Sequence, residues 1–156
     1  MDYLKNKKII LLAVVLLLIF LISIFFFTAR PAAAPLQAIV EINSRIIDVE
    51  IASTPRESYR GLSGREALCP DCGMLFVFPD KKERGFVMRE MNFPLDIIFI
   101  ADGQIIKIAE NCPPAGKNPD EVYRSGAPAD QVLEVNGGYA DKYYFKVGDE
   151  VRVKEK

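Results

Sequence analysis

The chain has 156 residues, with 20 basic and 21 acidic side chains and neither histidine nor tryptophan. Without histidine, the Ser-His-Asp and Cys-His catalytic schemes and most zinc sites are excluded. The first 30 residues hold four basic residues and one acidic residue, so the remainder has 16 basic and 20 acidic residues, a net charge of −4. This balance argues against nucleic acid as a partner.

The N-terminal segment is long and apolar. Residues 9–27 are interrupted only by Ser23 and follow three lysines within the first eight residues. At the helical rise, nineteen residues span about 28 Å, close to the thickness of the hydrocarbon core of a bilayer. Lysines that precede such a segment stay on the cytoplasmic side. We therefore predict one transmembrane helix at residues 9–27, in contact with the lipid bilayer, and a cytoplasmic segment at residues 1–8.

The remainder of the chain is predicted to lie outside the cytoplasm. Residues 28–37 are rich in proline and alanine and should form a linker to a domain at residues 38–156. The triplet at residues 32–34 (Ala-Ala-Ala) leaves open the removal of the leader as a cleaved signal. Because the apolar run is longer than that of a typical signal, we favour a retained anchor. The predicted location is the cell membrane, single-pass, with an extracytoplasmic C-terminal domain.

The first half of this domain shows a hairpin pattern followed by a helix pattern. Residues 38–49 alternate loosely and are rich in Ile and Val, which predicts a β-hairpin with a turn at Asn43-Ser44. The sequence Thr54-Pro55-Arg56-Glu57 is a capping box with proline at the first helical position. Gly61 suits the end of the helix. One short helix is therefore predicted between Thr54 and Gly61.

Two strands are expected after the helix. Residues 73–78 form a dense apolar run, which Pro79 should stop. Residues 80–84 are predicted to form a charged loop, and residues 85–88 to resume a strand.

The clearest hairpin signal is Asp102-Gly103, a two-residue turn whose backbone twist matches that of the flanking strands. This turn fixes the predicted register, because each side chain then has a defined opposite neighbour. Ile100 should face Ile105, and Asp96 should face Ala109.

The last part of the chain combines a long loop with short strands. Residues 111–129 are rich in Pro and Gly and long enough to predict a binding or lid role. Strands are expected at residues 131–136 and 150–154. The fold class is mainly β: a small antiparallel barrel-like or sandwich domain with one short helix, preceded by the single N-terminal transmembrane helix.

A series of short blocks resembles a known family, the domain-of-unknown-function family 192. The match extends over residues 39–153, and its blocks occur in one order: Arg60-Gly61-Leu62, Gly73-Met74-Leu75-Phe76, Phe86-Val87-Met88, Pro94-Leu95-Asp96-Ile97-Ile98-Phe99, Leu133-Glu134-Val135-Asn136-Gly137-Gly138 and Gly148-Asp149. The resemblance implies a compact β-rich fold and extracytoplasmic use, and it supplies no activity. The chain departs from the family pattern at Ser63 and Val87 and at Glu90-Met91, so a polar site of relatives would be altered here.

Three cysteines offer several kinds of chemistry. Cys69-Pro70-Asp71-Cys72 is a CxxC pattern, which serves as a redox pair, as half of a metal site or as a local disulfide. Zinc needs four ligands, and no histidine is available to supply one. We favour a structural disulfide because thiols oxidise outside the cytoplasm. The connectivity stays open, since Cys112 could bridge to Cys69 or to Cys72.

Two carboxylates lie inside apolar strands, where an unpaired charge is costly. Asp96 and Glu134 could together act as general acid and base in a carboxylate-based hydrolase, which needs no histidine. The alternative is structural: Lys107 lies diagonally from Asp96 in the predicted register and could pair with it. Glu134 would then accept backbone N–H bonds at a turn.

The favoured function is non-catalytic binding of a small ligand, an envelope polymer or a protein partner. We expect the binding surface between residues 88–96 and the loop at residues 111–129, because aromatic and Met side chains beside a Pro/Gly loop form a natural pocket mouth. No cofactor, metal or nucleic acid is predicted. The candidate ligand-binding residues are Met74, Phe76, Met88, Phe93, Asp96, Glu134 and Asn136.

Overall fold

The computed structural model describes residues 14–21 and 37–155. These ranges belong to two separate compact units, residues 1–34 and 35–156. Residues 14–21 are helical and their side chains are exposed. Within the described ranges, no helix is long and apolar enough to cross a membrane. The other residues of the predicted 9–27 span, and the linker up to residue 36, lie outside the described part of the chain.

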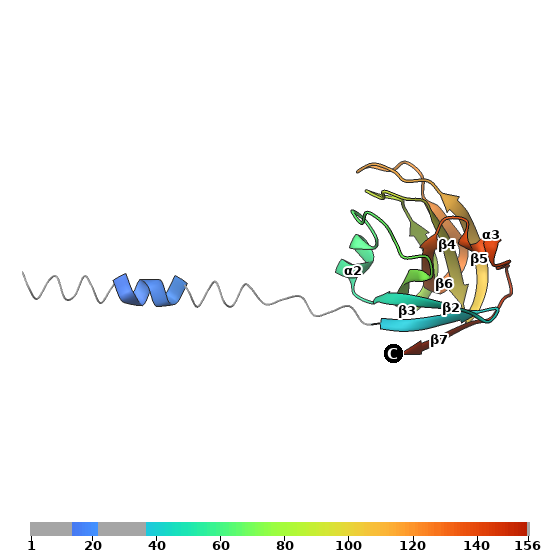
Figure 1. Cartoon of the computed structure of the whole chain (residues 1–156), viewed down its shortest axis with the longest axis horizontal. Coiled ribbons are helices and arrows are strands. Elements are labelled where there is room, and N and C mark those ends of the chain that lie inside the picture. Colours follow the sequence, from blue (N-terminus) through green and yellow to red (C-terminus); the bar gives the residue numbers. More distant parts are fainter. Residues whose placement is uncertain (1–13, 22–36, 156) are drawn as a thin grey trace, which may run out of the picture. The chain divides into compact units, whose positions relative to one another are not determined.

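The second unit is built on one curled sheet of seven strands in the order β5-β4-β6-β3-β2-β1-β7, which forms a half-barrel (Figure 1). Two short helices, α2 (Pro55–Arg60) and α3 (Tyr139–Lys142), accompany it. The mainly β prediction is confirmed, whereas the structure has a second helix and a single curled sheet. The strands are β1 (Gln37–Ile42), β2 (Arg45–Ala52), β3 (Cys72–Phe86), β4 (Leu95–Ala101), β5 (Gln104–Cys112), β6 (Tyr123–Asn136) and β7 (Val151–Glu155).

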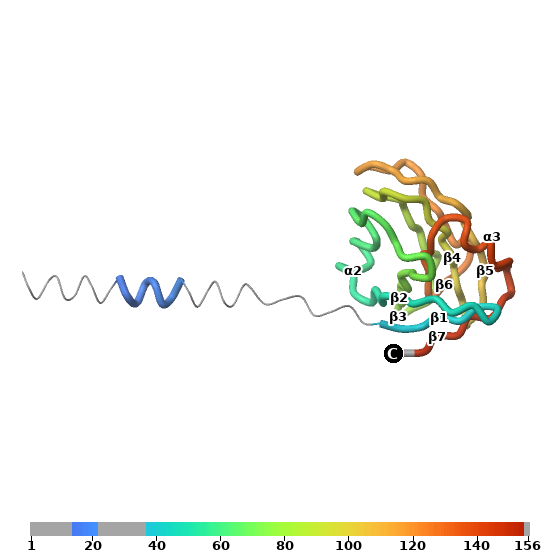
Figure 2. Tube along the Cα trace, viewed as in Figure 1, coloured from blue at the N-terminus to red at the C-terminus, as the bar shows by residue number. Residues whose placement is uncertain are grey.

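The N-terminal hairpin forms as predicted. β1 and β2 pair antiparallel around Asn43 and Ser44, whose φ angles are 49° and 63°. Two consecutive positive φ values are those of the type I′ turn that suits twisted strands. β1 also pairs with β7 at the edge of the sheet, so the C-terminal strand lies beside it (Figure 2).

The pairing of β2 with β3 is parallel, which the prediction of an antiparallel domain missed. Parallel neighbours need a crossover connection, and the chain uses residues 53–71 for it. Helix α2 lies in this crossover and has the expected capping box: Thr54 Oγ1 accepts from the Glu57 N–H, and Glu57 Oε2 accepts from the Thr54 N–H at 2.9 Å. The chain then turns at Gly61, with φ 49°.

Strands β3 and β6 form the longest ribbon of the sheet. β3 runs through Pro79 and the charged segment instead of stopping, and β6 begins at Tyr123, inside the predicted loop. The pairing shifts between Val77 and Lys82. Proline is tolerated there because a bulge needs no ladder hydrogen bond from its nitrogen. The predicted loop at residues 111–129 is therefore shortened.

The β4–β5 hairpin turns at the predicted Asp-Gly pair, and Ile100 faces Ile105 as expected. The register then shifts between Ile100 and Phe99, so that Phe99 faces Lys107. The pairs further from the turn therefore differ from those of the predicted register. The predicted pairing of Asp96 with Ala109 is therefore wrong, because Ala109 faces Ile97. A bulge of this kind leaves no clear trace in a local hydrophobic pattern.

The two edge strands meet at one end of the half-barrel. Ile105 N–H donates to the Asp149 carbonyl at 3.0 Å, and Gly148 N–H donates to the Ile105 carbonyl at 2.8 Å. The side chains on this face form one cluster with contributions from all seven strands and α3, including Ile105 and Val151 of the edges. This is therefore the inner face of the curl.

A second cluster lies on the opposite, outer face of β3, β6 and β4. It includes Phe76, Phe99 and Val132 of the sheet, covered by Leu62 and Met88. Residues 95–100 of β4 are consequently buried on both faces, since side chains alternate along the strand. The covered outer face is where the candidate site lies.

Close packing of β3 against β6 predicts that Gly73→Ala destabilises the domain. A Cβ at Gly73 would lie 2.7 Å from the Glu134 carbonyl oxygen and 3.2 Å from side-chain carbons of Leu133 and Val135. We expect a loss of about 1–3 kcal/mol in the free energy of unfolding, as for other overpacked cores. Urea denaturation of the full-length protein measures it. Gly116→Ala is the matched control, because nothing lies within 4 Å of its added Cβ; equal stability of the two variants would contradict the packing argument.

Candidate functional site

The covering layer of the outer face is held together by hydrogen bonds among three distant segments. Ser63 Oγ donates to the Arg89 carbonyl at 2.7 Å, and Gly64 N–H donates to the Glu90 carbonyl at 2.8 Å. Ala115 N–H in turn donates to the Met88 carbonyl at 3.0 Å. The crossover after α2, the segment after β3 and the loop after β5 are thus joined over the sheet.

A cavity of about 420 Å³ lies between this layer and the ribbon of β3 and β6. We call it the Glu134 cavity. Its lining combines aromatic rings, arginines and one buried carboxyl group: Ser58, Tyr59, Arg60, Gly61, Leu62, Ser63, Phe76, Phe78, Glu83, Arg84, Gly85, Phe86, Val87, Arg89, Met91 and Glu134.

Glu134 is the unusual member of this lining. The residue is 5% exposed, and its carboxyl group makes no hydrogen bond among the described residues. Its oxygens are not fully enclosed, because no fully enclosed side-chain oxygen of the described residues lacks a partner. Burial raises the pKa of Glu134 to about 8, because the charged form loses its hydration. A carboxyl group with this pKa is about nine-tenths protonated at pH 7. Glu134 therefore presents a neutral acid, able both to donate and to accept a hydrogen bond.

Aromatic rings form the walls beside Glu134. Phe76 and Phe86 meet edge to face with their centroids 4.8 Å apart. A Cβ at Gly61 would lie 3.5 Å from the Phe76 ring and 3.9 Å from Glu134 Oε2. The turn after α2, where the positive φ favours glycine, thus lies directly beside the carboxyl group.

Arginines surround the aromatic walls. The Arg89 guanidinium stacks 4.0 Å from the Tyr59 ring centroid and donates to the Tyr59 carbonyl. Arg84 stacks 3.9 Å from the Phe78 centroid and pairs with Asp80 at 2.7 Å. The stacking holds these cations over apolar surface at the cavity, where they favour an anionic group.

A second pocket of about 870 Å³ adjoins the first and shares Tyr59 and Arg89 with it. Its other side is formed by residues 90–92 and by 115–117 of the loop after β5. This pocket lies between the two segments that the sequence indicated as a binding surface. The Glu134 cavity itself lies further under α2.

Asp96 is buried on the other face of the sheet. Its Oδ1 accepts from the N–H groups of Asn111 at 2.7 Å and Gly138 at 2.9 Å, and its Oδ2 accepts from Ala140 N–H at 2.7 Å. The predicted Lys107–Asp96 ion pair is wrong, because the Lys107 ammonium donates to the Arg124 carbonyl.

Asp96 and Glu134 point to opposite faces of the sheet. Asp96 pairs in register with Val135, and Glu134 pairs with Ile97. Since neighbouring residues of a strand alternate between faces, the two carboxyl groups are separated by the sheet. The structure does not bring them together as an acid–base pair.

The cysteines lie away from the cavity. Cys69 and Cys72 form a disulfide, and Cys112 is a buried free thiol. The option in which Cys112 is bridged is therefore wrong, because that side chain packs into the outer-face cluster. Burial raises the pKa of the Cys112 thiol to about 11. Among the described residues, no three Cys, Asp or Glu side chains gather in a group able to hold a metal ion.

Of the candidate ligand-binding residues, the structure places Phe76 and Glu134 at the cavity. Met74 and Met88 are buried in the outer-face cluster, and Phe93 packs against it. Asp96 lies on the inner face, as described above. Asn136 donates from Nδ2 to the Cys69 carbonyl at 2.9 Å and so belongs to the disulfide turn.

Sequence reasoning missed the residues that α2 and the segment after β3 contribute. Tyr59 of α2 is 72% exposed and lies at the cavity. Arg89 carried no local signal. Four of the blocks that carry the family resemblance line the cavity, around Gly61, Phe76, Phe86 and Glu134. In the sequence, these family blocks were the signal that could have located the cavity.

Comparison with models of known protein families assigns the chain to a family. The model of the DUF192 family, described as "Uncharacterized ACR", matches residues 38–153. The chain belongs to the DUF192 family. The matched residues include the whole sheet except its first and last few positions, and they contain the Glu134 cavity.

Two solved structures are similar to this DUF192 chain. One, from Sinorhizobium meliloti 1021, is described as a candidate transcription regulator; it is 30% identical, with a TM-score of 0.70, and the match covers 80% of this chain and 98% of the other. The second, a protein of unknown function from Novosphingobium aromaticivorans, is 32% identical with a TM-score of 0.68, covering 80% and 93%. Among curated proteins, none matches.

The raised pKa of Glu134 predicts a pH-dependent stability. An unfolded glutamate has a pKa near 4.5 and the folded Glu134 about 8, so the contribution is fully present below about pH 4.5 and is lost as pH rises to about 8. The loss reaches up to about 5 kcal/mol. Glu134→Gln cannot ionise, so its stability relative to the natural protein should increase from pH 5 to pH 9.

Urea denaturation of the full-length protein at both pH values measures this difference. The exposed cavity residue Glu83 provides the control, Glu83→Gln, which should follow the natural protein at both pH values. Parallel stability curves for the natural protein and Glu134→Gln would contradict the assignment of a neutral Glu134.

Proposed function

We propose that this domain binds a small amphipathic anion in the Glu134 cavity and acts as a non-catalytic module on the outer side of the cell membrane, anchored by residues 9–27. The observation that carries the proposal is the Glu134 carboxyl group, which belongs to a residue only 5% exposed, makes no hydrogen bond among the described residues and lines the cavity. Burial disfavours the charged form of this group, so the protonated carboxyl group has a donor and an acceptor to offer. A ligand in the cavity could hydrogen-bond to both.

The size and lining of the cavity support a small ligand over a polymer. A volume of about 420 Å³ lies within the range of small-molecule sites, roughly 300–1,000 Å³. The rings of Phe76, Phe78 and Phe86 offer apolar walls for a flat or acyl body. Arg60 and Arg89, also in the lining, attract an anionic group.

Nucleic-acid binding is not part of this proposal. The description of the Sinorhizobium protein as a candidate transcription regulator concerns that protein. In this chain, the residues after position 30 carry a net charge of −4. Binding to a phosphate backbone depends on neutralisation by Lys and Arg, for which this balance is unfavourable.

Two probes of opposite charge test the proposed ligand class. Full-length protein in neutral detergent micelles should bind 2-naphthalenesulfonate in isothermal titration calorimetry, with heats of the empty micelles subtracted. It should bind the matched cation, 2-naphthyltrimethylammonium, at least tenfold more weakly. Arg89→Ala should weaken sulfonate binding about tenfold, a loss of about 1.4 kcal/mol.

Arg152→Ala is the matched control, because it removes the same charge from a β7 residue that pairs with Glu150. It should change sulfonate affinity less than twofold. Equal binding of the two probes, or equal effects of the two arginine variants, would refute a specific anion site in the cavity.

The proposed location rests on the apolar segment at residues 9–27 after three lysines. Protease added to intact cells should digest the domain at residues 38–156, and the chain should stay in the membrane fraction after a carbonate wash. Complete protection of the domain in intact cells, with digestion only after lysis, would place it in the cytoplasm and refute the proposed topology.

A further inference from the structure

The Cys69–Cys72 disulfide closes a turn that is already held by contacts without sulfur. Cys72 N–H donates to the Cys69 carbonyl at 3.2 Å, and Asp48 N–H donates to the Asp71 carbonyl at 2.9 Å. Asn136 Nδ2 adds a bond of 2.9 Å to the Cys69 carbonyl. A disulfide between residues only three apart closes a very short loop and removes little entropy from the unfolded chain. The fold therefore depends little on this bond.

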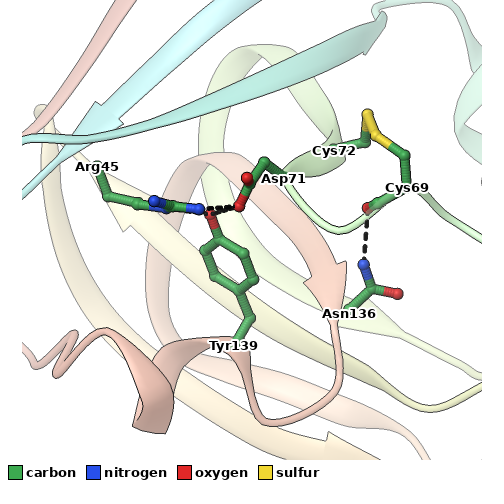
Figure 3. Close-up of polar contacts among 6 residues, drawn as sticks. All are labelled: Arg45, Cys69, Asp71, Cys72, Asn136 and Tyr139. Atoms are coloured by element: carbon green, nitrogen blue, oxygen red, sulfur yellow. Dashed lines mark hydrogen bonds and ion pairs between the residues drawn. A yellow bond between two sulfur atoms is a disulfide. The ribbon is translucent and has the colours of Figure 1, made fainter.

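Asp71, inside the turn, is fixed and neutralised by its own partners. Arg45 pairs with its carboxylate, and Tyr139 donates to the same oxygen at 3.1 Å (Figure 3). The hydrogen bond from Arg45 holds the pKa of Asp71 below its usual range, and the charge of Lys142 adds to this effect. The negative charge of Asp71 is thus neutralised by Arg45, and it would repel a neighbouring thiolate only weakly.

The disulfide is accessible from outside. Cys69 and Pro70 are exposed and Cys72 is half-buried. Figure 3 shows the two sulfur atoms directed away from the Arg45–Asp71–Tyr139 group. A hollow of about 320 Å³ borders the turn at Pro70.

We propose that the Cys69–Cys72 disulfide is a thiol–disulfide exchange site that accepts two electrons from a dithiol-bearing protein. This inference is independent of the Glu134 cavity. It rests on an exposed Cys69, on a half-buried Cys72 three residues later, and on the hydrogen bonds that hold the turn in addition to the disulfide.

The exchange balances in two steps. A thiolate of the partner attacks Cys69 Sγ, the Cys69–Cys72 bond breaks, and Cys72 leaves as a thiolate that takes up a proton. The partner's second thiol then loses its proton and attacks its own sulfur in the mixed disulfide, which releases Cys69 as a thiol. The partner dithiol is oxidised to a disulfide, and this chain is reduced to two thiols.

The surroundings indicate a stoichiometric exchanger and not a fast catalyst. In thioredoxin-type sites a helix N-terminus lowers the pKa of the attacking cysteine. Here Cys72 is the first residue of β3, and Cys69 lies in the crossover. Exchange at this disulfide should therefore be slower than at such catalysts.

A synthetic Cys-Gly-Gly-Cys peptide serves as the probe for full-length protein in detergent. Excess reduced peptide should raise the free thiols of the protein, titrated after denaturation, from one to three. The thermal midpoint of the reduced protein should stay within about 5 °C of the oxidised one. No gain of thiols, or a gain accompanied by a larger fall of the midpoint, would overturn the proposal and leave the bond as a structural link.

Single-cysteine variants test which sulfur is attacked. Cys72→Ser keeps the exposed Cys69 thiol and should form a mixed disulfide with oxidised glutathione at least tenfold faster than Cys69→Ser. Cys112→Ser should reduce and reoxidise like the natural protein, because that thiol is buried. Equal rates for the Cys69 and Cys72 variants would overturn the assignment of Cys69 as the exchanging sulfur.

Discussion

The Asp96 carboxylate anchors one end of the domain. It is fully buried in β4, next to the edge strand β5, and accepts three backbone N–H bonds of 2.7–2.9 Å from the end of β5 and the start of α3. Hydrogen bonds to a charged group are among the stronger ones in proteins. They fix Gly138 and α3, and Tyr139 then reaches Arg45 and Asp71 across the inner face. The disulfide turn is placed through this chain of contacts.

The domain thus contains two buried acidic residues that differ in their hydrogen bonding. Asp96 has three donors, whereas Glu134, on the other face of the neighbouring strand β6, has none among the described residues. The hydrogen bonds of Asp96 are made within the fold, and they explain the positions of α3 and of the segment before it. Glu134 makes none, so its carboxyl group can still bond to a ligand at the boundary of the cavity. This contrast separates a structural acid from a candidate binding group more clearly than the sequence context of either residue.

Local signals in the sequence were sufficient for local structure. The turns at Asn43-Ser44 and Asp102-Gly103 and the capping box at Thr54 could be predicted, since each depends on neighbouring residues only. The passage of β3 through Pro79 could not, because it depends on a bulge opposite β6. Of the candidate site, Glu134 stood out as an acid within an apolar strand. Arg89 and Tyr59 did not, because only the tertiary fold brings them beside it.

The parallel pairing of β2 and β3 explains why there is a cavity at all. An antiparallel hairpin would have joined these strands by a tight turn and left the outer face bare. The crossover at residues 53–71 instead returns over the sheet and provides a wall that is independent of the hydrogen-bonded ladder. Ligand preference in this architecture can therefore diverge through exchanges in one connecting segment, while the sheet beneath it keeps its packing and its register.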